Sequence, residues 1–597
     1  MRQDKRFGRV SRRRFLAMLG ATLTWIATGC GRRERQPPSP TAAPPASPTA
    51  TLRPLASFTP TAQPTVANTA GTADMAFING KVITVDHADT ITQAVSVKDG
   101  LIQAVGSSDE LRSRIGASTR VVDLKGKTLT PGLIDPHNHF QVVALFGSYF
   151  QPFLPPEVKS IDDMKARLAK VASDTPKGQW IVGYYLTIGE GGIPNRFDLD
   201  PVTPDHPVWM MQQGGHYGAA NSAGLKLAGI SSKTPNPVGG IIERDAAGEP
   251  TGVFFNHRAM DVLRKAIPLW TTDQTRENII ATQPIFASCG VTTFHDNNVR
   301  GTDAVKVYLD LGRQNKMYLR GSVYYTLEWP NDLSRALNEI EHYSDAFVRF
   351  AGFKFLIDGQ APTAFCHEPH DGISWNVSTW EARNFKDTVR ALHDTGLQIC
   401  VHCAGDAATD LALDAYEAAM DANPRPDPRH RLEHAVITTP EATRRIKDLG
   451  VVVSTQPQFL RVSGDSWIKS FGEERAKRFI VTREWLENGV HVALGSDAPT
   501  TPWYCPQITL AGAIARTSYS GTVMGPEQRL TIQEALRAHT MGAAYAGHEE
   551  NIKGSVEPGK LADLVVWDED FYTSEVKRIP QITVAMTIVN GKVVYSA

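Results

Sequence analysis

Several histidines and one aspartate in this chain stand where their side chains could bind a metal ion. His137 and His139 are separated by one residue, and on an extended segment two such side chains point the same way and can hold one divalent cation. His402, His434 and Asp497 each follow a short apolar segment farther along the chain. Imidazole nitrogens and carboxylate oxygens are common ligands of zinc and similar ions. Together they indicate a site built to bind a divalent metal ion.

The elements that must position these residues are eight apolar segments that alternate with helical stretches between about residues 131 and 548. The segments are 133–135, 290–294, 319–324, 352–357, 397–401, 431–434, 451–455 and 490–495. Such runs are typical of parallel strands buried on both faces, although a doubly wound open sheet would produce a similar pattern. Eight of them predict an α/β fold with a (β/α)₈ barrel of the TIM type. Its active site would lie at the carboxyl ends of the strands.

Two further parts are expected around the barrel. The gap between residues 135 and 290 is too long for one helix, so we expect a large insertion after the first strand, over about 145–285. Both ends of the folded region carry a strand, an Asn-Gly-Lys turn and a second strand, at Asn79 and at Asn590. Residues 73–130 and 549–597 are therefore predicted to form one small β-sandwich domain, because each half-sheet alone lacks a buried face.

The first 72 residues have the composition of an export segment followed by a tether. Arg12 and Arg13 precede an apolar run that is too short to span a bilayer, and Cys30 follows small residues. Residues 1–30 thus resemble a twin-arginine signal with a bacterial lipoprotein cysteine; a basic amphipathic helix with a chance cysteine is the alternative. Residues 31–72, rich in Pro, Thr, Ser and Ala, predict a disordered tether. We expect an exported protein, periplasmic or held on the outer face of the cytoplasmic membrane by its lipid anchor alone.

Composition excludes some classes of function. Lys and Arg total 62 against 63 Asp and Glu, giving a net charge of −1, so nucleic acid is not an expected partner. Six cysteines are too few for a disulfide scaffold and lack the paired spacing of a structural zinc site. Cysteine is therefore not expected to organise the fold.

The order of the candidate ligands resembles the amidohydrolase superfamily, whose pattern is His-x-His on strand one, Lys or another ligand on strand four, His on strands five and six, and Asp on strand eight. More narrowly the chain is similar to the amidohydrolase family 3 branch, which includes N-substituted formamide deformylases. The stretches that carry the likeness are 129–139, 239–244, 249–253 and 557–564, and it extends from about residue 73 to the C-terminus.

The resemblance implies one or two divalent ions, with zinc favoured and iron or manganese as alternatives. The implied ligands are His137, His139, Lys354, His402, His434 and Asp497. It also implies that Lys354 is N6-carboxylated and bridges two ions, whereas the plain interpretation of Lys354 is a salt bridge to Asp358 or a solvated end.

The implied reaction is hydrolysis of a carbon–nitrogen bond, other than a peptide bond, in a small-molecule amide such as an N-formyl or N-acyl amine. The nucleophile would be a metal-bridging hydroxide, and Asp497 would be the catalytic residue that takes its proton and delivers it to the leaving amine. An esterase, lactonase or phosphotriesterase on the same barrel is the alternative, and a non-catalytic lipid-anchored binding protein is a remote one.

His216, His295 and Gln456 are candidate substrate contacts. His216 is equally well interpreted as a structural turn residue, and His295 as a partner of the metal ligands. The sequence leaves open the substrate, the physiological metal and homo-oligomerisation.

Overall fold

The computed structural model describes residues 71–146, 149–154, 157–185, 192–212, 214–268, 270–360, 363–368, 376–501 and 505–597. The expected export signal, including Cys30, and nearly all of the expected tether lie outside the described residues. Among the helices of the described residues, none combines the length and apolar character needed to cross a membrane.

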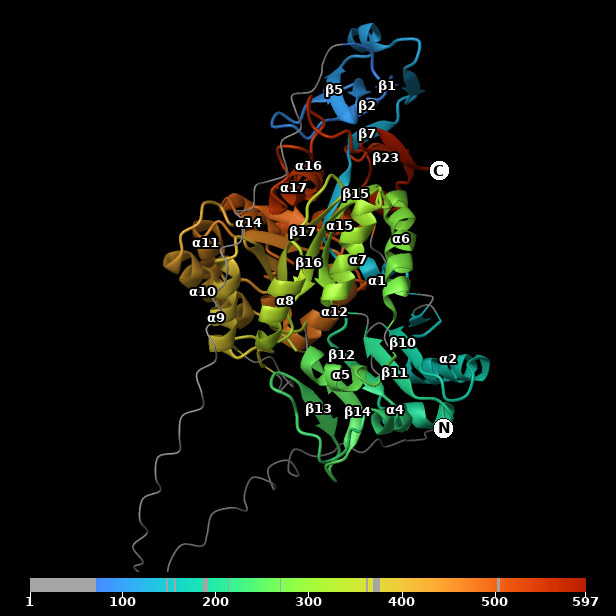
Figure 1. Ribbon diagram of the computed structural model, residues 1–597, viewed down its shortest axis with the longest axis vertical. Coiled ribbons are helices and arrows are strands. Elements are labelled where there is room, and N and C mark those ends of the chain that lie inside the picture. The colour runs from blue at the N-terminus through green and yellow to red at the C-terminus, as the bar shows by residue number, and fades with distance from the viewer. Residues whose placement is uncertain are drawn as a thin grey trace, which may run out of the picture. The chain divides into compact units, whose positions relative to one another are not determined.

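Eight parallel strands form the central sheet, in the order β21-β20-β19-β18-β17-β16-β15-β8 (Figure 1). They are β8 (Leu133–Asn138), β15 (Val291–Val299), β16 (Arg320–Thr326), β17 (Val348–Leu356), β18 (Gln398–Cys403), β19 (Arg431–His434), β20 (Val452–Thr455) and β21 (Val492–Leu494). Almost every residue in these strands is buried, as expected for strands covered on both faces. This burial explains why their sequences are apolar without alternation.

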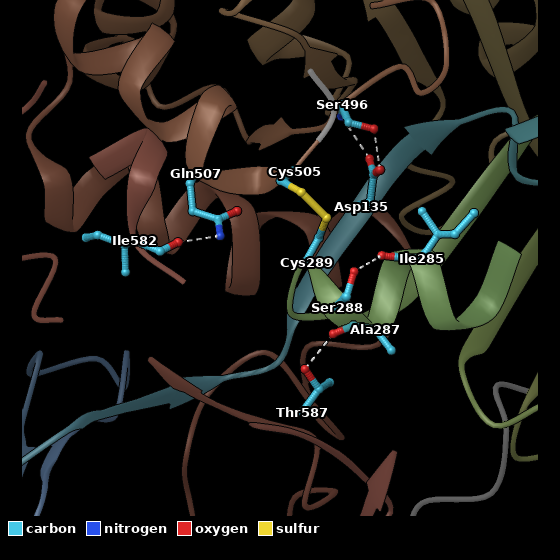
Figure 2. Close-up of a disulfide and its surroundings, with 10 residues drawn as sticks. All are labelled: Asp135, Ile285, Ala287, Ser288, Cys289, Ser496, Cys505, Gln507, Ile582 and Thr587. Carbon is cyan, nitrogen blue, oxygen red and sulfur yellow. Dashed lines mark hydrogen bonds between the residues drawn. A yellow bond between two sulfur atoms is a disulfide. The ribbon is translucent and has the colours of Figure 1, made fainter. Parts of the chain in front are cut away.

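The two edges of this sheet meet, which distinguishes a barrel from an open sheet. The amide of Asp497, just after β21, donates to the carbonyl oxygen of His137 in β8 at 2.7 Å. The amide of Ser496 donates to Asp135 Oδ1 at 2.9 Å, and its hydroxyl donates to Oδ2 at 2.5 Å (Figure 2). The predicted (β/α)₈ barrel is therefore confirmed.

Helices alternate with the barrel strands along the chain and surround the sheet (Figure 1). They are α1 (Phe140–Val143), α6 (Thr272–Ser288), α7 (Thr302–Arg313), α8 (Leu333–Glu339), α9 (Ala382–His393), α10 (Asp406–Ala422), α11 (Pro440–Asp448), α12 (Phe459–Phe471), α13 (Glu473–Ala476), α14 (Thr482–Glu487), α15 (Pro506–Ala515), α16 (Ile532–Arg537) and α17 (Ala543–Ala546). Several begin with a capping side chain, such as Thr271 before α6 and Thr531 before α16. Such caps satisfy backbone amides that the first helical turn leaves without partners.

A second sheet occupies the chain between β8 and β15, in the order β13-β14-β12-β11-β10-β9. Its strands are β9 (Gln151–Phe153), β10 (Ile181–Tyr185), β11 (Val208–Gln212), β12 (Tyr217–Ala220), β13 (Ile241–Arg244) and β14 (Pro250–Phe255), with helices α2 (Ile161–Asp174), α3 (Arg196–Leu199), α4 (Ser222–Leu227) and α5 (Asn256–Arg264). Antiparallel pairing places Tyr217 of β12 opposite Phe255 of β14. The residues just outside this pair, His216 and Asn256, are therefore neighbours.

Two more sheets contain strands from both ends of the chain, in the orders β5-β4-β1-β6 and β24-β23-β22-β7-β2-β3. They comprise β1 (Met75–Ile78), β2 (Lys81–Ile83), β3 (Ile91–Thr92), β4 (Ala94–Lys98), β5 (Leu101–Gly106), β6 (Arg120–Asp123), β7 (Thr128–Pro131), β22 (Leu564–Trp567), β23 (Val584–Val589) and β24 (Lys592–Ser596). Strand β22 pairs with β7 on one side and β23 on the other. One apolar cluster unites the two sheets, with Phe77 and Val97 from one and Leu129 and Ile588 from the other.

A disulfide joins Cys289, at the end of α6, to Cys505, just before α15 (Figure 2). Next to it, the Thr587 hydroxyl of β23 donates to the carbonyl oxygen of Ala287 at 2.7 Å. The expectation that cysteine does not organise the fold is therefore wrong at this corner, where barrel helices and the C-terminal sheet are tied together. The two cysteines are 216 positions apart, so no local spacing indicated the pair.

Candidate metal centre

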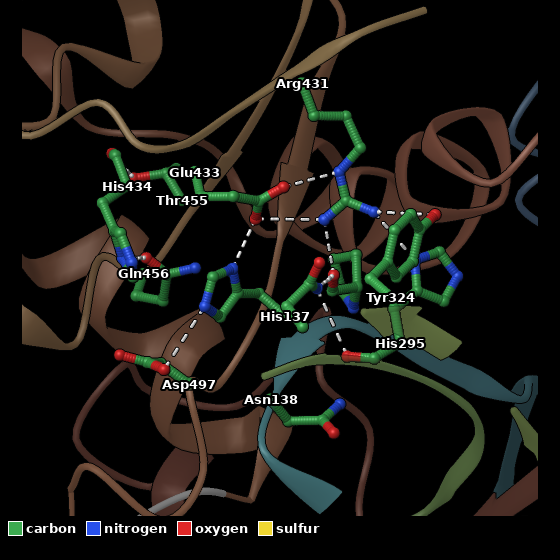
Figure 3. Close-up of polar contacts among 12 residues, drawn as sticks. His137, Asn138, His295, Tyr324, Arg431, Glu433, His434, Thr455, Gln456 and Asp497 are labelled. Atoms are coloured by element: carbon green, nitrogen blue, oxygen red, sulfur yellow. Dashed lines mark hydrogen bonds and ion pairs between the residues drawn. The ribbon is translucent and has the colours of Figure 1, made fainter. Parts of the chain in front are cut away.

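The candidate metal ligands gather at the carboxyl ends of the barrel strands, and Figure 3 shows three of them, His137, His434 and Asp497. One ligand atom from each of His137, His434 and Asp497 lies within 4.8 Å of the other two. The ring of His402 is centred 4.4 Å from that of His434, and the ring of His139 is centred 5.6 Å from that of His137. The structure thus brings together five predicted ligands from β8, β18, β19 and the end of β21.

Asp497 faces His137 in β8 and His139 just after it. Its Oδ1 lies 2.8 Å from His139 Nε2 and 3.4 Å from His137 Nε2. Burial alone would raise the pKa of Asp497, but the neighbouring His137 and His139 hold it well below its usual range. Burial lowers the pKa of His434 well below its ordinary value. The centre therefore combines neutral imidazole with an anionic carboxylate, the protonation states that metal ligands require.

Backbone geometry at the strand ends turns these side chains inward. His434 and Asp497 have φ values of 73° and 52°, in the left-handed region that residues with a side chain rarely adopt. Successive side chains of a regular strand point to opposite faces, yet Glu433 and His434 both face the barrel interior (Figure 3). The unusual backbone therefore contributes directly to the site, where such strain is characteristically found.

Three of the histidines are each held by a hydrogen bond at Nδ1, which fixes the ring and leaves Nε2 directed to the centre. The pairs are His137 with Glu433, His402 with Asp358 at 2.9 Å, and His434 with Gln456 at 2.6 Å. A carboxylate or amide oxygen at Nδ1 makes that nitrogen the donor, so Nε2 keeps its lone pair for a metal. Nε2 of His402 is buried and has no hydrogen-bond partner among the described residues. The donor set therefore fits a divalent cation.

Lys354 lies in β17 on the wall of this centre. It is 1% exposed, and within the described part of the chain its Nζ has no hydrogen-bond partner. Burial lowers the pKa of Lys354. The interpretation as a salt bridge to Asp358 is wrong, because Asp358 accepts from His402 and from the amides of Ala404 and Gly405 instead.

The three candidate substrate contacts have different positions. His216 reaches the centre from the insertion, with its ring 5.0 Å from that of His402. Gln456 lies beside His434, and its Oε1 is the hydrogen-bond partner of His434 Nδ1, while its Nε2 has no hydrogen-bond partner among the described residues. His295 does not end its strand, because β15 continues to Val299; instead it lies inside the barrel, where Arg431 Nη1 is 3.0 Å from its Nδ1.

Sequence reasoning missed Glu433 and Arg431 as parts of the centre. Both side chains are fully buried in β19, and Glu433 contacts His137 directly. A signal was present, since Arg431 and Glu433 are two opposite charges at alternate positions of a strand predicted to be buried. Such charges need a partner inside the fold.

Comparison with known proteins agrees with this geometry. The profile of the amidohydrolase family matches residues 120–595. The chain is 31% identical over 543 residues to the N-substituted formamide deformylase of Arthrobacter pascens, covering 87% of this chain and 98% of that protein. It is 31% identical over 547 residues to the protein LONG AFTER FAR-RED 3 of Arabidopsis thaliana, covering 88% of this chain and 92% of that protein.

Among solved structures, an uncharacterized metal-dependent hydrolase from Pyrococcus furiosus is similar, with a TM-score of 0.64 and 26% identity. The match covers 84% of this chain and 100% of that one. The family predicted from the sequence is confirmed by the profile match and by the relatives that align along most of their length. This chain belongs to the amidohydrolase family.

Proposed function

We propose that the protein is a metal-dependent hydrolase that cleaves the carbon–nitrogen bond of a small-molecule amide, with N-substituted formamides as the favoured substrates. The observation that carries this proposal is the convergence of His137, His434 and Asp497 within 4.8 Å at the mouth of the barrel. The substrate class follows the similarity to the Arthrobacter pascens deformylase. It is therefore the part of the proposal that most needs a direct test.

Six side chains would hold the metal: His137, His139, Lys354, His402, His434 and Asp497. When bound, a divalent ion polarises the substrate carbonyl and lowers the pKa of a water molecule. Asp497 contacts His137 and His139 through Oδ1, so we assign proton transfer to Oδ2. Oδ2 would take the proton of the attacking water and deliver it to the nitrogen of the leaving amine.

The insertion supplies the wall that would receive the substrate. His216 Nδ1 and Asn256 Oδ1 are buried, and neither has a hydrogen-bond partner in the described part of the chain. Both approach Gly359, where an added Cβ would lie 3.1 Å from His216 Nδ1 and 2.7 Å from Asn256 Oδ1. Unpaired buried polar atoms are costly unless a ligand pairs them. An amide substrate offers both a donor and an acceptor for this wall.

We further propose that Lys354 is carboxylated. Reaction of its neutral amine with CO₂ forms a carbamate and releases a proton, which converts Lys354 into an anionic oxygen ligand able to bridge two ions. The burial of Lys354 and its unpartnered Nζ support this proposal. Intact-mass spectrometry of protein held under CO₂ would show an added carboxyl group, which Lys354→Arg would abolish. Zinc is the expected ion, with iron and manganese as alternatives.

The test of the main proposal is metal analysis together with a substrate panel. We expect at least about one equivalent of zinc, iron or manganese per purified chain, and release of formate and amine from N-substituted formamides. The panel should include N-acyl amines, lactones, aryl esters and phosphotriesters. Hydrolysis of only the lactones, aryl esters or phosphotriesters would contradict the proposed amidase activity and support the alternative, an esterase, lactonase or phosphotriesterase. A metal-free protein that hydrolyses none of these compounds would contradict the proposal that this protein is a metal-dependent hydrolase.

We also propose that the protein is exported and lipid-anchored. The support is the sequence of residues 1–30, together with the Cys289–Cys505 disulfide, since such bonds persist in oxidising compartments. Replacing Arg12 and Arg13 with lysine should retain the protein in the cytosol, and Cys30→Ala should release it from the membrane fraction. Unchanged fractionation of either variant would contradict the corresponding step.

A further inference from the structure

Arg431 lies at the centre of a buried polar network beneath the metal centre (Figure 3). Its side chain is 0% exposed. Nε is 2.7 Å from Glu433 Oε1, and Nη2 donates to Glu433 Oε2 at 3.0 Å. Nη2 also donates to the carbonyl oxygen of Pro136 at 2.6 Å, while Nη1 lies 3.0 Å from His295 Nδ1 and 3.4 Å from the Tyr324 hydroxyl. One guanidinium thus contacts four other residues.

Glu433 connects this network to the metal centre. Its Oε1 faces Arg431, and its Oε2 is shared by Arg431 Nη2 and His137 Nδ1. Glu433 is itself 0% exposed. A glutamate side chain can rotate about several bonds, so Glu433 alone would not hold the imidazole ring of His137 in one orientation. The hydrogen bond from Arg431 Nη2 to Oε2, together with the ion pair between Arg431 Nε and Oε1, holds the carboxylate in one orientation.

We propose that Arg431 is a positioning residue for metal binding, which orients Glu433 and the backbone of Pro136 so that His137 presents Nε2 to the ion. This inference rests on the proposed metal-dependent function. Arg431 contacts His137 only through its neighbours: Glu433 holds the ring, and Pro136 is the residue before His137 in β8. The planar guanidinium of Arg431 therefore fixes both the side chain and the backbone of His137.

The requirement is for arginine specifically. Its planar guanidinium places donors in fixed directions, so the carboxylate and the Pro136 carbonyl can be contacted at the same time. A lysine ammonium at this position would keep the charge but could not reproduce both contacts in the same geometry. Arg431→Lys therefore tests positioning alone, because it keeps the positive charge and loses the simultaneous contacts with Glu433 and Pro136.

The alternative is a purely structural ion pair, and the chain offers a matched control. Arg320, at the start of β16, pairs with Asp563 at 2.7 Å from Nε to Oδ2 and 3.0 Å from Nη2 to Oδ1. These side chains are 5% and 3% exposed. Arg320 stands at the amino end of its strand, whereas the metal ligands gather at the carboxyl ends. Arg320→Lys thus makes the same substitution in a comparable buried pair away from the centre.

The experiment measures metal affinity by competition with a chromogenic zinc chelator, on metal-free full chain whose fold is checked by circular dichroism and thermal melting. We expect Arg431→Lys to bind zinc about 10- to 100-fold more weakly than wild type, the usual effect of losing a partner of a metal ligand. Arg320→Lys should bind within about 2-fold of wild type. Saturating zinc should restore kcat of Arg431→Lys, because Arg431 does not touch the reacting atoms.

Glu433→Gln is the second variant, used if Arg431→Lys fails to fold. It keeps the shape of the side chain and should also weaken zinc binding about 10-fold or more. Wild-type affinity in a folded Arg431→Lys or Glu433→Gln, or an equal loss in Arg320→Lys, would overturn the inference. A wild-type protein without zinc affinity would instead overturn the proposed function, so the two failures are distinguishable.

Discussion

Gln456 Oε1 accepts a hydrogen bond from His434 Nδ1 at 2.6 Å. Because an amide oxygen only accepts, this contact fixes Nδ1 as the donor and keeps the lone pair of His434 on Nε2. Gln456 follows β20, so the seventh barrel strand orients a ligand on the sixth. The same relationship joins Asp358, just after β17, to His402 in β18.

Gln456→Leu should weaken metal binding without preventing folding. The variant removes the acceptor at Nδ1, so the ring is free to rotate and to change tautomer, and we expect about 10- to 100-fold lower affinity. Gln456→Glu retains an acceptor oxygen and should bind more tightly than the leucine variant. Activity titrated against added zinc measures both, and superimposable titrations of Gln456→Leu and wild type would refute the prediction.

Asp497→Asn should lower kcat by about 100- to 10,000-fold, since an amide cannot take the proton of the attacking water. Asp414→Asn, on α10 and about half exposed, is the control for a lost carboxylate and should keep normal turnover. The measurement is kcat at saturating zinc, with metal content determined in each sample. If Asp497→Asn at full metal occupancy keeps wild-type kcat, Asp497 is not the proton carrier.

His393 and His430 form a buried pair that should make stability depend on pH. His393 Nδ1 lies 2.9 Å from His430 Nε2, His393 Nε2 lies 2.8 Å from the carbonyl oxygen of Asn423, and the amide of Ile399 donates to His430 Nδ1. These partners require both rings to be neutral. Burial lowers the pKa of His430 well below its ordinary value and also lowers that of His393.

The sign follows from proton binding. At a pH below about 6.5 the unfolded chain protonates these histidines while the folded chain does not, so the free energy of unfolding falls as the pH falls. Replacing His430 with Gln should flatten this dependence by up to about 1.4 kcal/mol per pH unit. Urea denaturation of metal-free protein at several pH values between 7.5 and 5 measures the slope. Parallel slopes for variant and wild type would show that His430 does not contribute.

The Cys289–Cys505 disulfide should stabilise the folded chain by about 2–5 kcal/mol, because it closes a long loop in the unfolded state. Replacing both cysteines with Ala should lower the free energy of unfolding by that amount, as measured with urea. A reducing agent should destabilise the wild type and leave the double variant unchanged. Equal sensitivity of both proteins to the reductant would show that another thiol is responsible.

The sequence predicted the barrel and the gathering of His137, His139, His402, His434 and Asp497 at one end of it because both depend on local patterns. Apolar segments mark the strands, and histidines or an aspartate at their ends mark the site. The roles of Gln456 and His295 could not be predicted, because they depend on side-chain direction and on strand length. Strand β15 runs to Val299, so His295 is an interior residue and not a terminal one.

Contacts between distant parts of the chain were equally beyond sequence reasoning. His434 faces inward beside Glu433 because its left-handed backbone lets two consecutive side chains share the inner face. The approach of His216 to His402 depends on the pairing of β12 with β14 in the insertion. These features are set by tertiary packing, which cannot be predicted from the hydrophobic periodicity of the sequence.

The pairing of β22 with β7 also has a consequence for how the protein is made. Strand β7 leads into β8 and its first metal ligands, and Trp567 Nε1 donates to Thr130 Oγ1 at 2.9 Å across 437 positions of sequence. During synthesis the side of β7 that pairs with β22 stays unpaired until the last segments leave the ribosome. The strand that leads into the first metal ligands therefore gains its second neighbour only after translation of the C-terminal strands.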